Sequence, residues 1–62
     1  MFVVTDMIVG EKLGFKNRYD AEVEVERRLS IHRNGYSLRR TYIPPIKCHV
    51  SVEGDNYTIC LD

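Results

Sequence analysis

The sequence lacks a long apolar run, and no stretch approaches the ~20 apolar residues that a membrane-spanning helix needs. Its opening residues, MFVVTDMIVG, also lack the basic segment of a signal peptide, and Asp6 interrupts their apolar character. We therefore expect a cytoplasmic protein that does not associate with a membrane.

Cysteine is scarce, with two residues at positions 48 and 60. In a chain without an export signal, two thiols are expected to stay reduced rather than form a disulfide framework. Their spacing relative to the two histidines gives neither CxxC nor HxxxH, whereas structural zinc usually takes four converging ligands. We therefore predict no metal site and no cofactor.

A net charge is missing as well, because nine basic residues balance nine acidic ones. This balance argues against a general binder of polyanions, although the charges are segregated along the chain. Residues 20–26 carry four acidic residues and no basic one. Residues 27–52 carry six Lys or Arg residues and two His residues, and no acidic one.

The short length of 62 residues predicts a single domain that spans 1–62. A domain of this size buries only about 60% of the surface that its unfolded chain exposes. Its stability is therefore expected to be only a few kcal/mol, and such domains usually rely on a staple, a partner or a very consistent local sequence.

Residues 19–33 fit two kinds of secondary structure. A strand places the odd positions on one face, and from 19 to 31 only Arg27 breaks their apolar character. Asn34-Gly35 follows, which is the strongest short signal for a hairpin turn. We therefore predict a strand at 19–33. The alternative is a helix at about 19–33, ended by Gly35 as a C-cap and packed on an antiparallel sheet. Its shared face would consist of Ala21, Val25, Leu29 and His32.

The C-terminal residues repeat the hairpin pattern. A turn signal around Gly54-Asp55 separates two segments of alternating character, IKCHVSV and YTICLD. Pairing across this turn predicts one apolar face, formed by Val52 opposite Tyr57, Val50 opposite Ile59 and Cys48 opposite Leu61. Cys48 and Cys60 then point to opposite faces, which disfavours a disulfide between them.

These segments together predict a mainly β fold, a small five-stranded antiparallel barrel or curved sheet of the SH3-like or OB-like kind. Its hairpins would lie at Asn34-Gly35 and Gly54-Asp55. GEKLGFKNR, residues 10–18, is expected to be a loop. Pro44-Pro45 is expected to end the third strand or to mark a sheet edge, because proline cannot donate a ladder hydrogen bond. The strands are expected near 2–9, 19–33, 36–43, 46–52 and 57–61.

Catalytic residues are few. His49 and Cys60 fall opposite each other in the second hairpin, so a thiol–imidazole pair is geometrically allowed. A small sheet without a pocket-forming insertion is a poor setting for such chemistry, and one Cys–His pair is a weak signal. We therefore expect no enzyme, and we interpret both side chains as ordinary surface or packing residues.

Arginine gives the clearest functional lead. The predicted hairpin places Arg27 and Arg28 on one strand and Arg39 and Arg40 on the next, in a basic band across the sheet. A guanidinium group binds carboxylate and phosphate oxygens through its planar fork of donors. The alternative is a solvated face whose arginines pair with the preceding glutamates, at ~0–1 kcal/mol per pair. The candidate partner-binding residues are Arg27, Arg28, Arg33, Tyr36, Arg39, Arg40 and Tyr42.

These observations predict a non-enzymatic protein-binding module, an adaptor or inhibitor of a type that viruses also encode. It would occlude or recruit a larger protein through its charge-segregated sheet surface. A homodimer through a sheet edge is a further expectation. The alternative function is nucleic-acid binding through the Arg-rich hairpin 27–42, where arginines would contact phosphates and tyrosines would stack on bases.

Overall fold

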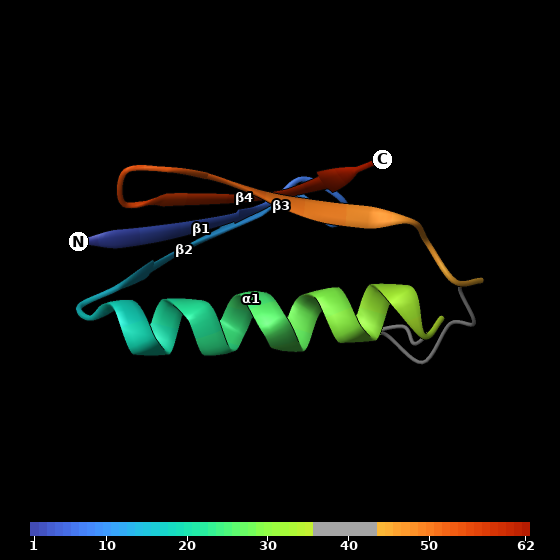
Figure 1. Ribbon diagram of the computed structural model, residues 1–62, viewed down its shortest axis with the longest axis horizontal. Helices are drawn as coiled ribbons and strands as arrows, with labels where there is room; N and C mark the ends of the chain where they lie inside the picture. The colour runs from blue at the N-terminus through green and yellow to red at the C-terminus, as the bar shows by residue number, and fades with distance from the viewer. Residues whose placement is uncertain (36–43) are drawn as a thin grey trace.

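The computed structural model describes residues 1–35 and 44–62, which form one β-sheet with a helix on one face (Figure 1). The sheet order is β2-β1-β4-β3, with antiparallel β1–β2 and β3–β4 hairpins and a parallel β1–β4 pair between them. The described residues therefore form a small α+β fold with a mixed sheet. Its elements are β1 (Phe2–Asp6), β2 (Glu11–Phe15), α1 (Arg18–Arg33), β3 (Cys48–Glu53) and β4 (Asn56–Leu61).

The predicted strand at 19–33 is wrong, and the alternative of a helix is confirmed by α1. Asn17 caps the helix, because its Oδ1 accepts a hydrogen bond of 2.9 Å from the Asp20 amide and its Nδ2 donates to the Asp20 carboxylate at 3.0 Å. The alternating pattern misled because it assigned Arg28 and His32 to a solvent face. Both side chains are buried in the helix–sheet interface, where they meet a carboxylate.

The predicted hairpin at Asn34-Gly35 is also wrong, because these two residues end the helix α1. Asn34 is the C-cap of α1, and its amide donates to the Ser30 carbonyl at 3.0 Å. Gly35 follows with a φ of 77°, a left-handed conformation that suits glycine at a helix end. The five-stranded barrel is thereby ruled out, since a helix takes the place of its longest strand. The predicted strand at 36–43 lies outside the described residues.

The C-terminal hairpin is confirmed in its register. Val52 lies opposite Tyr57, Val50 opposite Ile59 and Cys48 opposite Leu61. The predicted apolar face is only partly buried in the core. The residues at its two ends, Val52 and Leu61, are 58% and 61% exposed.

The N-terminal residues form a hairpin that the sequence did not predict. β1 is shorter than the predicted strand at 2–9, because Asp6 Oδ1 accepts a 3.0 Å hydrogen bond from the Ile8 amide and starts a turn. The turn closes at Gly10, which has a φ of 73°. β2 lies where a loop was expected, in residues 10–18.

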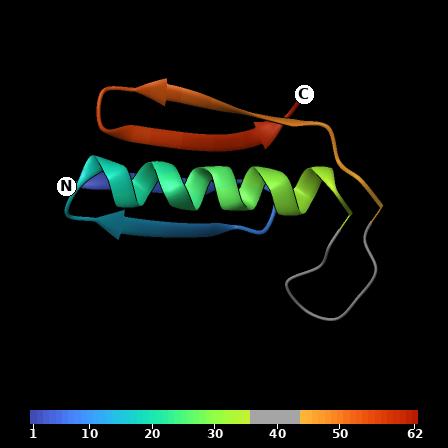
Figure 2. The same cartoon turned by 60° about the horizontal axis from the view of Figure 1, so that its bottom comes forward.

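The core lies between the sheet and α1, which runs along the middle of one sheet face with β3–β4 on one side and β2 on the other (Figure 2). Its buried hydrophobic residues are Val4, Ala21, Val25, Leu29, Cys48, Tyr57 and Ile59. No other described element covers the opposite sheet face. Within residues 1–35 and 44–62, no helix is long and apolar enough to cross a bilayer.

Candidate functional site

A buried ionic network joins α1 to the end of β1. The Asp6 side chain is 1% exposed, and its Oδ2 accepts a 2.9 Å hydrogen bond from Arg28 Nη1 and lies 3.0 Å from His32 Nε2. Arg28 also donates through Nη1 to Glu11 at 3.1 Å and through Nε to Glu24 at 2.6 Å. The network thus consists of two helix side chains that converge on a strand carboxylate, with two further carboxylates around the guanidinium.

The charges of this network stabilise one another. Burial alone would raise the pKa of Asp6, but hydrogen bonds from His32 and Arg28 lower that pKa below its usual value. For the cation Arg28 the directions are reversed. Burial alone would lower its pKa, but hydrogen bonds to Glu24, Asp6 and Glu11 raise that pKa above its usual value. Every described buried polar side-chain atom has a partner, so the buried part of this network joins the helix to the sheet.

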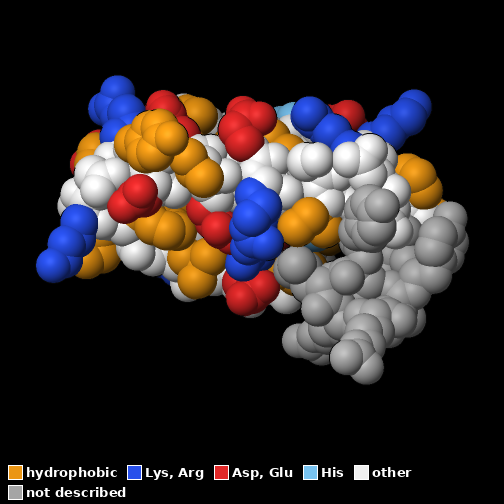
Figure 3. All heavy atoms as spheres, turned by 90° about the horizontal axis from the view of Figure 1, so that it is seen from below, with side chains coloured by type: hydrophobic (Ala, Val, Ile, Leu, Met, Phe, Trp, Pro, Cys, Tyr) orange, Lys and Arg blue, Asp and Glu red, His pale blue; other side chains and the backbone are white. Residues whose placement is uncertain are grey.

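The predicted arginine site is divided by the fold. Arg27 is half exposed and pairs with Glu24 at 2.6 Å, whereas Arg28 is buried in the network around Asp6. The geometry of the predicted basic band is therefore wrong, since it required both residues on a strand. On the helix side of the molecule, acidic, basic and hydrophobic side chains are interspersed (Figure 3). Four predicted site residues lie outside the described residues and remain predictions: Tyr36, Arg39, Arg40 and Tyr42.

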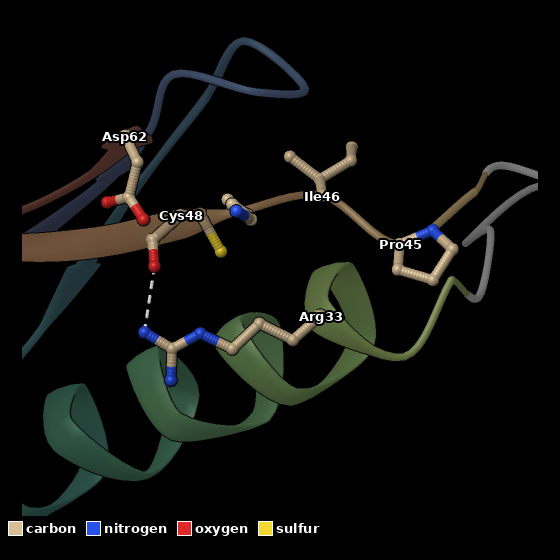
Figure 4. Close-up of a pocket in the computed structure, with 6 residues that line it drawn as sticks. Arg33, Pro45, Ile46, Cys48 and Asp62 are labelled. Atoms are coloured by element: carbon tan, nitrogen blue, oxygen red, sulfur yellow. Dashed lines mark hydrogen bonds between the residues drawn. The ribbon is translucent and has the colours of Figure 1, made fainter.

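The remaining predicted residue, Arg33, lies at a pocket of about 340 Å³ where the end of α1 approaches the start of β3 (Figure 4). Its guanidinium donates a 2.7 Å hydrogen bond to the Cys48 carbonyl. Arg33 is therefore engaged with the backbone at the first residue of β3. The pocket is lined by Arg33, Pro45, Ile46, Lys47, Cys48 and Asp62.

β3 is an edge strand of the sheet among the described residues. The Asp62 amide donates to the Lys47 carbonyl at 3.1 Å. Lys47 and Asp62 are therefore a hydrogen-bonded pair of the antiparallel β3–β4 ladder. Bonded and non-bonded pairs alternate along an antiparallel ladder, which turns the backbone groups of Cys48, Val50 and Val52 away from β4. Arg33 satisfies the Cys48 carbonyl. The open part of this edge is therefore the segment from Val50 to Val52.

An apolar groove with an acidic rim adjoins this open edge. It has a volume of about 400 Å³, at the small end of the ~300–1,000 Å³ typical of ligand pockets. Two exposed carboxylates, Glu22 and Glu26, flank it from α1 and form no ion pair within the described part of the chain. The groove is lined by Glu22, Val25 and Glu26 of α1, Val50 and Val52 of β3, and Tyr57 of β4.

The groove was not predicted, although two of its features were visible in the sequence. Glu22 and Glu26 belong to the acidic run 20–26, and a spacing of four residues places them on one side of a helix. Val50 and Val52 belong to the predicted apolar face. The strand prediction for 19–33 concealed their proximity, since the groove exists only where a helix lies beside β3.

Metal binding has no geometric support in the regions that the structure describes, where no three His, Cys, Asp or Glu side chains are placed to hold an ion. Comparison with known proteins identifies no relative: no family model, no curated protein and no solved structure matches the chain.

Proposed function

We propose that the protein is a non-enzymatic protein-binding module that adds an extended, basic segment of a larger protein to the edge of β3. The observation that carries this proposal is the juxtaposition of an open strand edge with an apolar groove and an acidic rim. A bound strand would occlude or recruit its parent protein without any chemical step.

The backbone of β3 would supply much of the affinity. Between Val50 and Val52 the outward amides and carbonyls are available in the part of the molecule that the structure describes, and a sheet edge of this kind is a template for a further strand. In such strand addition, main-chain hydrogen bonds give affinity and pockets for alternate side chains give specificity. Arg33 limits the register, because it occupies the Cys48 carbonyl.

The groove and its rim would select the segment. An apolar side chain of the incoming strand would contact Val25, Val50 and Tyr57, and a Lys or Arg side chain would reach Glu22 or Glu26. Exposed ion pairs contribute only ~0–1 kcal/mol each. Their main effects would be on specificity and on the rate of association, because unlike charges attract the basic segment and repel an acidic one.

Charge reversal tests this proposal. Short peptides that alternate Val with Lys should bind the wild-type chain more tightly than matched peptides that alternate Val with Glu, as measured by titration calorimetry. Replacing both rim residues, E22K and E26K, should reverse the preference, because the rim would then repel lysine. D55K is the matched control, since Asp55 is exposed in the β3–β4 turn and does not line the groove.

Three outcomes would contradict the proposal: equal binding of both peptides, a preference that survives the reversal of the rim, or binding to neither peptide. Sedimentation of the free chain would show whether a second copy occupies the edge instead. A mobility shift with an oligonucleotide that is lost in R39E/R40E would favour nucleic-acid binding through 27–42.

A further inference from the structure

Three side chains with complementary chemistry lie on the sheet face that is turned away from α1. Cys60 Sγ lies 3.2 Å from His49 Nε2, and His49 Nδ1 lies 2.7 Å from Asp62 Oδ1. His49 and Asp62 are 50% and 53% exposed, and Cys60 is partly buried. A thiol, an imidazole and a carboxylate in this order are the arrangement of a nucleophile, a base and the group that orients the base.

The β3–β4 ladder holds this arrangement in place. The register sets His49 directly opposite Cys60, and the 3.1 Å bond from the Asp62 amide to the Lys47 carbonyl keeps the end of β4 on the ladder. Side chains two residues apart in a strand lie on one face, so Asp62 joins Cys60 on the open face. The sequence predicted the opposition of Cys60 and His49, and the structure adds the carboxylate.

The hydrogen bonds define the direction of proton transfer. With Asp62 accepting from Nδ1–H, Nε2 presents its lone pair to the thiol. The next acceptor of the thiol, the His49 carbonyl, lies farther away at 3.9 Å. This arrangement allows the imidazole to act as the base for Cys60, with Asp62 as a positioning residue that would stabilise the resulting imidazolium.

We propose that Cys60, His49 and Asp62 form a nucleophilic thiol site that exchanges with disulfides of small thiols and retains the product as a mixed disulfide. His49 takes the proton of the Cys60 thiol, and the thiolate attacks one sulfur of the incoming disulfide. A bond forms between Cys60 and that sulfur while the original S–S bond breaks. The departing thiolate takes the proton from the His49 imidazolium, so one disulfide is consumed, one mixed disulfide is formed and one thiol is released.

The position of the second cysteine explains why the mixed disulfide would persist. Cys48 is 2% exposed and lies in the core beneath α1, on the other side of the sheet. It cannot reach Cys60 without unfolding of the hairpin, so it cannot displace the bound thiol. The site would therefore store a reversible modification on the open face, separate from the groove on the helix side, and would release it only to an external thiol.

The rate of thiol exchange tests this proposal on the folded full chain. With dithiobis(nitrobenzoate) as the probe disulfide, Cys60 should react in a fast phase that C60S abolishes. H49A should slow this phase about tenfold or more, because general-base catalysis by a positioned imidazole is typically worth ~10²–10⁴. Free imidazole should restore part of the rate, which a purely structural role of His49 would not allow. D62N should slow the phase less than H49A.

S51A is the matched control, because Ser51 is two residues from His49 on the same face of β3 and should leave the rate unchanged. Incubation with oxidised glutathione should add one glutathione at Cys60 and none at Cys48, as detected by mass spectrometry. A fast phase that persists in C60S, an equal rate in folded H49A, or the absence of a glutathione adduct would each overturn the proposal.

Discussion

At the scale of single residues, Asp6 has three roles in the fold. It ends β1, starts the following turn and accepts hydrogen bonds from two helix side chains. A carboxylate that interrupts an apolar strand is a signal of a buried ion pair, but its partners, Arg28 and His32, lie 22 and 26 residues away. Local patterns cannot identify such partners. The helix alternative placed His32 on its buried face, but no local pattern indicated that Arg28 lies inside.

The variant D6N should destabilise the protein strongly. The amide keeps the size of the side chain but removes the charge that compensates Arg28 in the interior, and breaking a buried ion pair costs about 3–5 kcal/mol. Urea denaturation near neutral pH should therefore show a large loss in the free energy of unfolding. D55N is the control, because Asp55 is exposed in a turn and should change this free energy little.

The same pair of variants has a predicted pH dependence. The pKa of Asp6 is lowered in the folded state, so its contribution is fully present above the unfolded value of about 3.9 and is lost as pH falls through the folded value. Wild type and D55N should thus lose stability in acid more steeply than D6N. Glu24 has a lowered pKa as well, first through its bond to Arg27, and should leave D6N with some acid dependence. Parallel acid profiles of wild type and D6N would contradict the role of Asp6.

At the scale of elements, α1 shows how a local pattern can be overruled. Residues 19–33 alternate in polarity like a strand, yet capping by Asn17 and burial of Ala21, Val25 and Leu29 favour a helix. The second hairpin was predictable because a turn at Gly54 fixes the register of its neighbours. The parallel pairing of β1 with β4 was not predictable, because it joins segments that are distant in the sequence and α1 lies in the connection between them.

Removing the helix cap should have a measurable cost. In N17A the Asp20 amide loses its side-chain acceptor, which typically costs about 1 kcal/mol. For a domain of this size, this corresponds to a fall in Tm of ~4–8 °C, to be measured by circular dichroism. N17D keeps an acceptor at the cap and should remain close to wild type. An unchanged Tm in N17A would show that the tertiary packing of α1 alone determines where the helix begins.

At the scale of the whole molecule, the fold redistributes the charges that the sequence segregates. Of the acidic run 20–26, Asp20 completes the cap and Glu24 pairs with two arginines, while Glu22 and Glu26 stay at the groove. Of the described arginines in the basic run, Arg28 is buried and Arg33 bonds to β3. The charge asymmetry was predictable from the sequence, but the surface that it creates depends on the helix.

Amide hydrogen exchange would show directly whether an extended basic segment pairs with the edge of β3. On addition of the Val/Lys peptide, the amides of Val50 and Val52 should become protected, because they point away from β4 and would bond to the added strand. Unchanged exchange at these two amides at a saturating peptide concentration, or protection confined to β2, would show that the segment does not pair with β3.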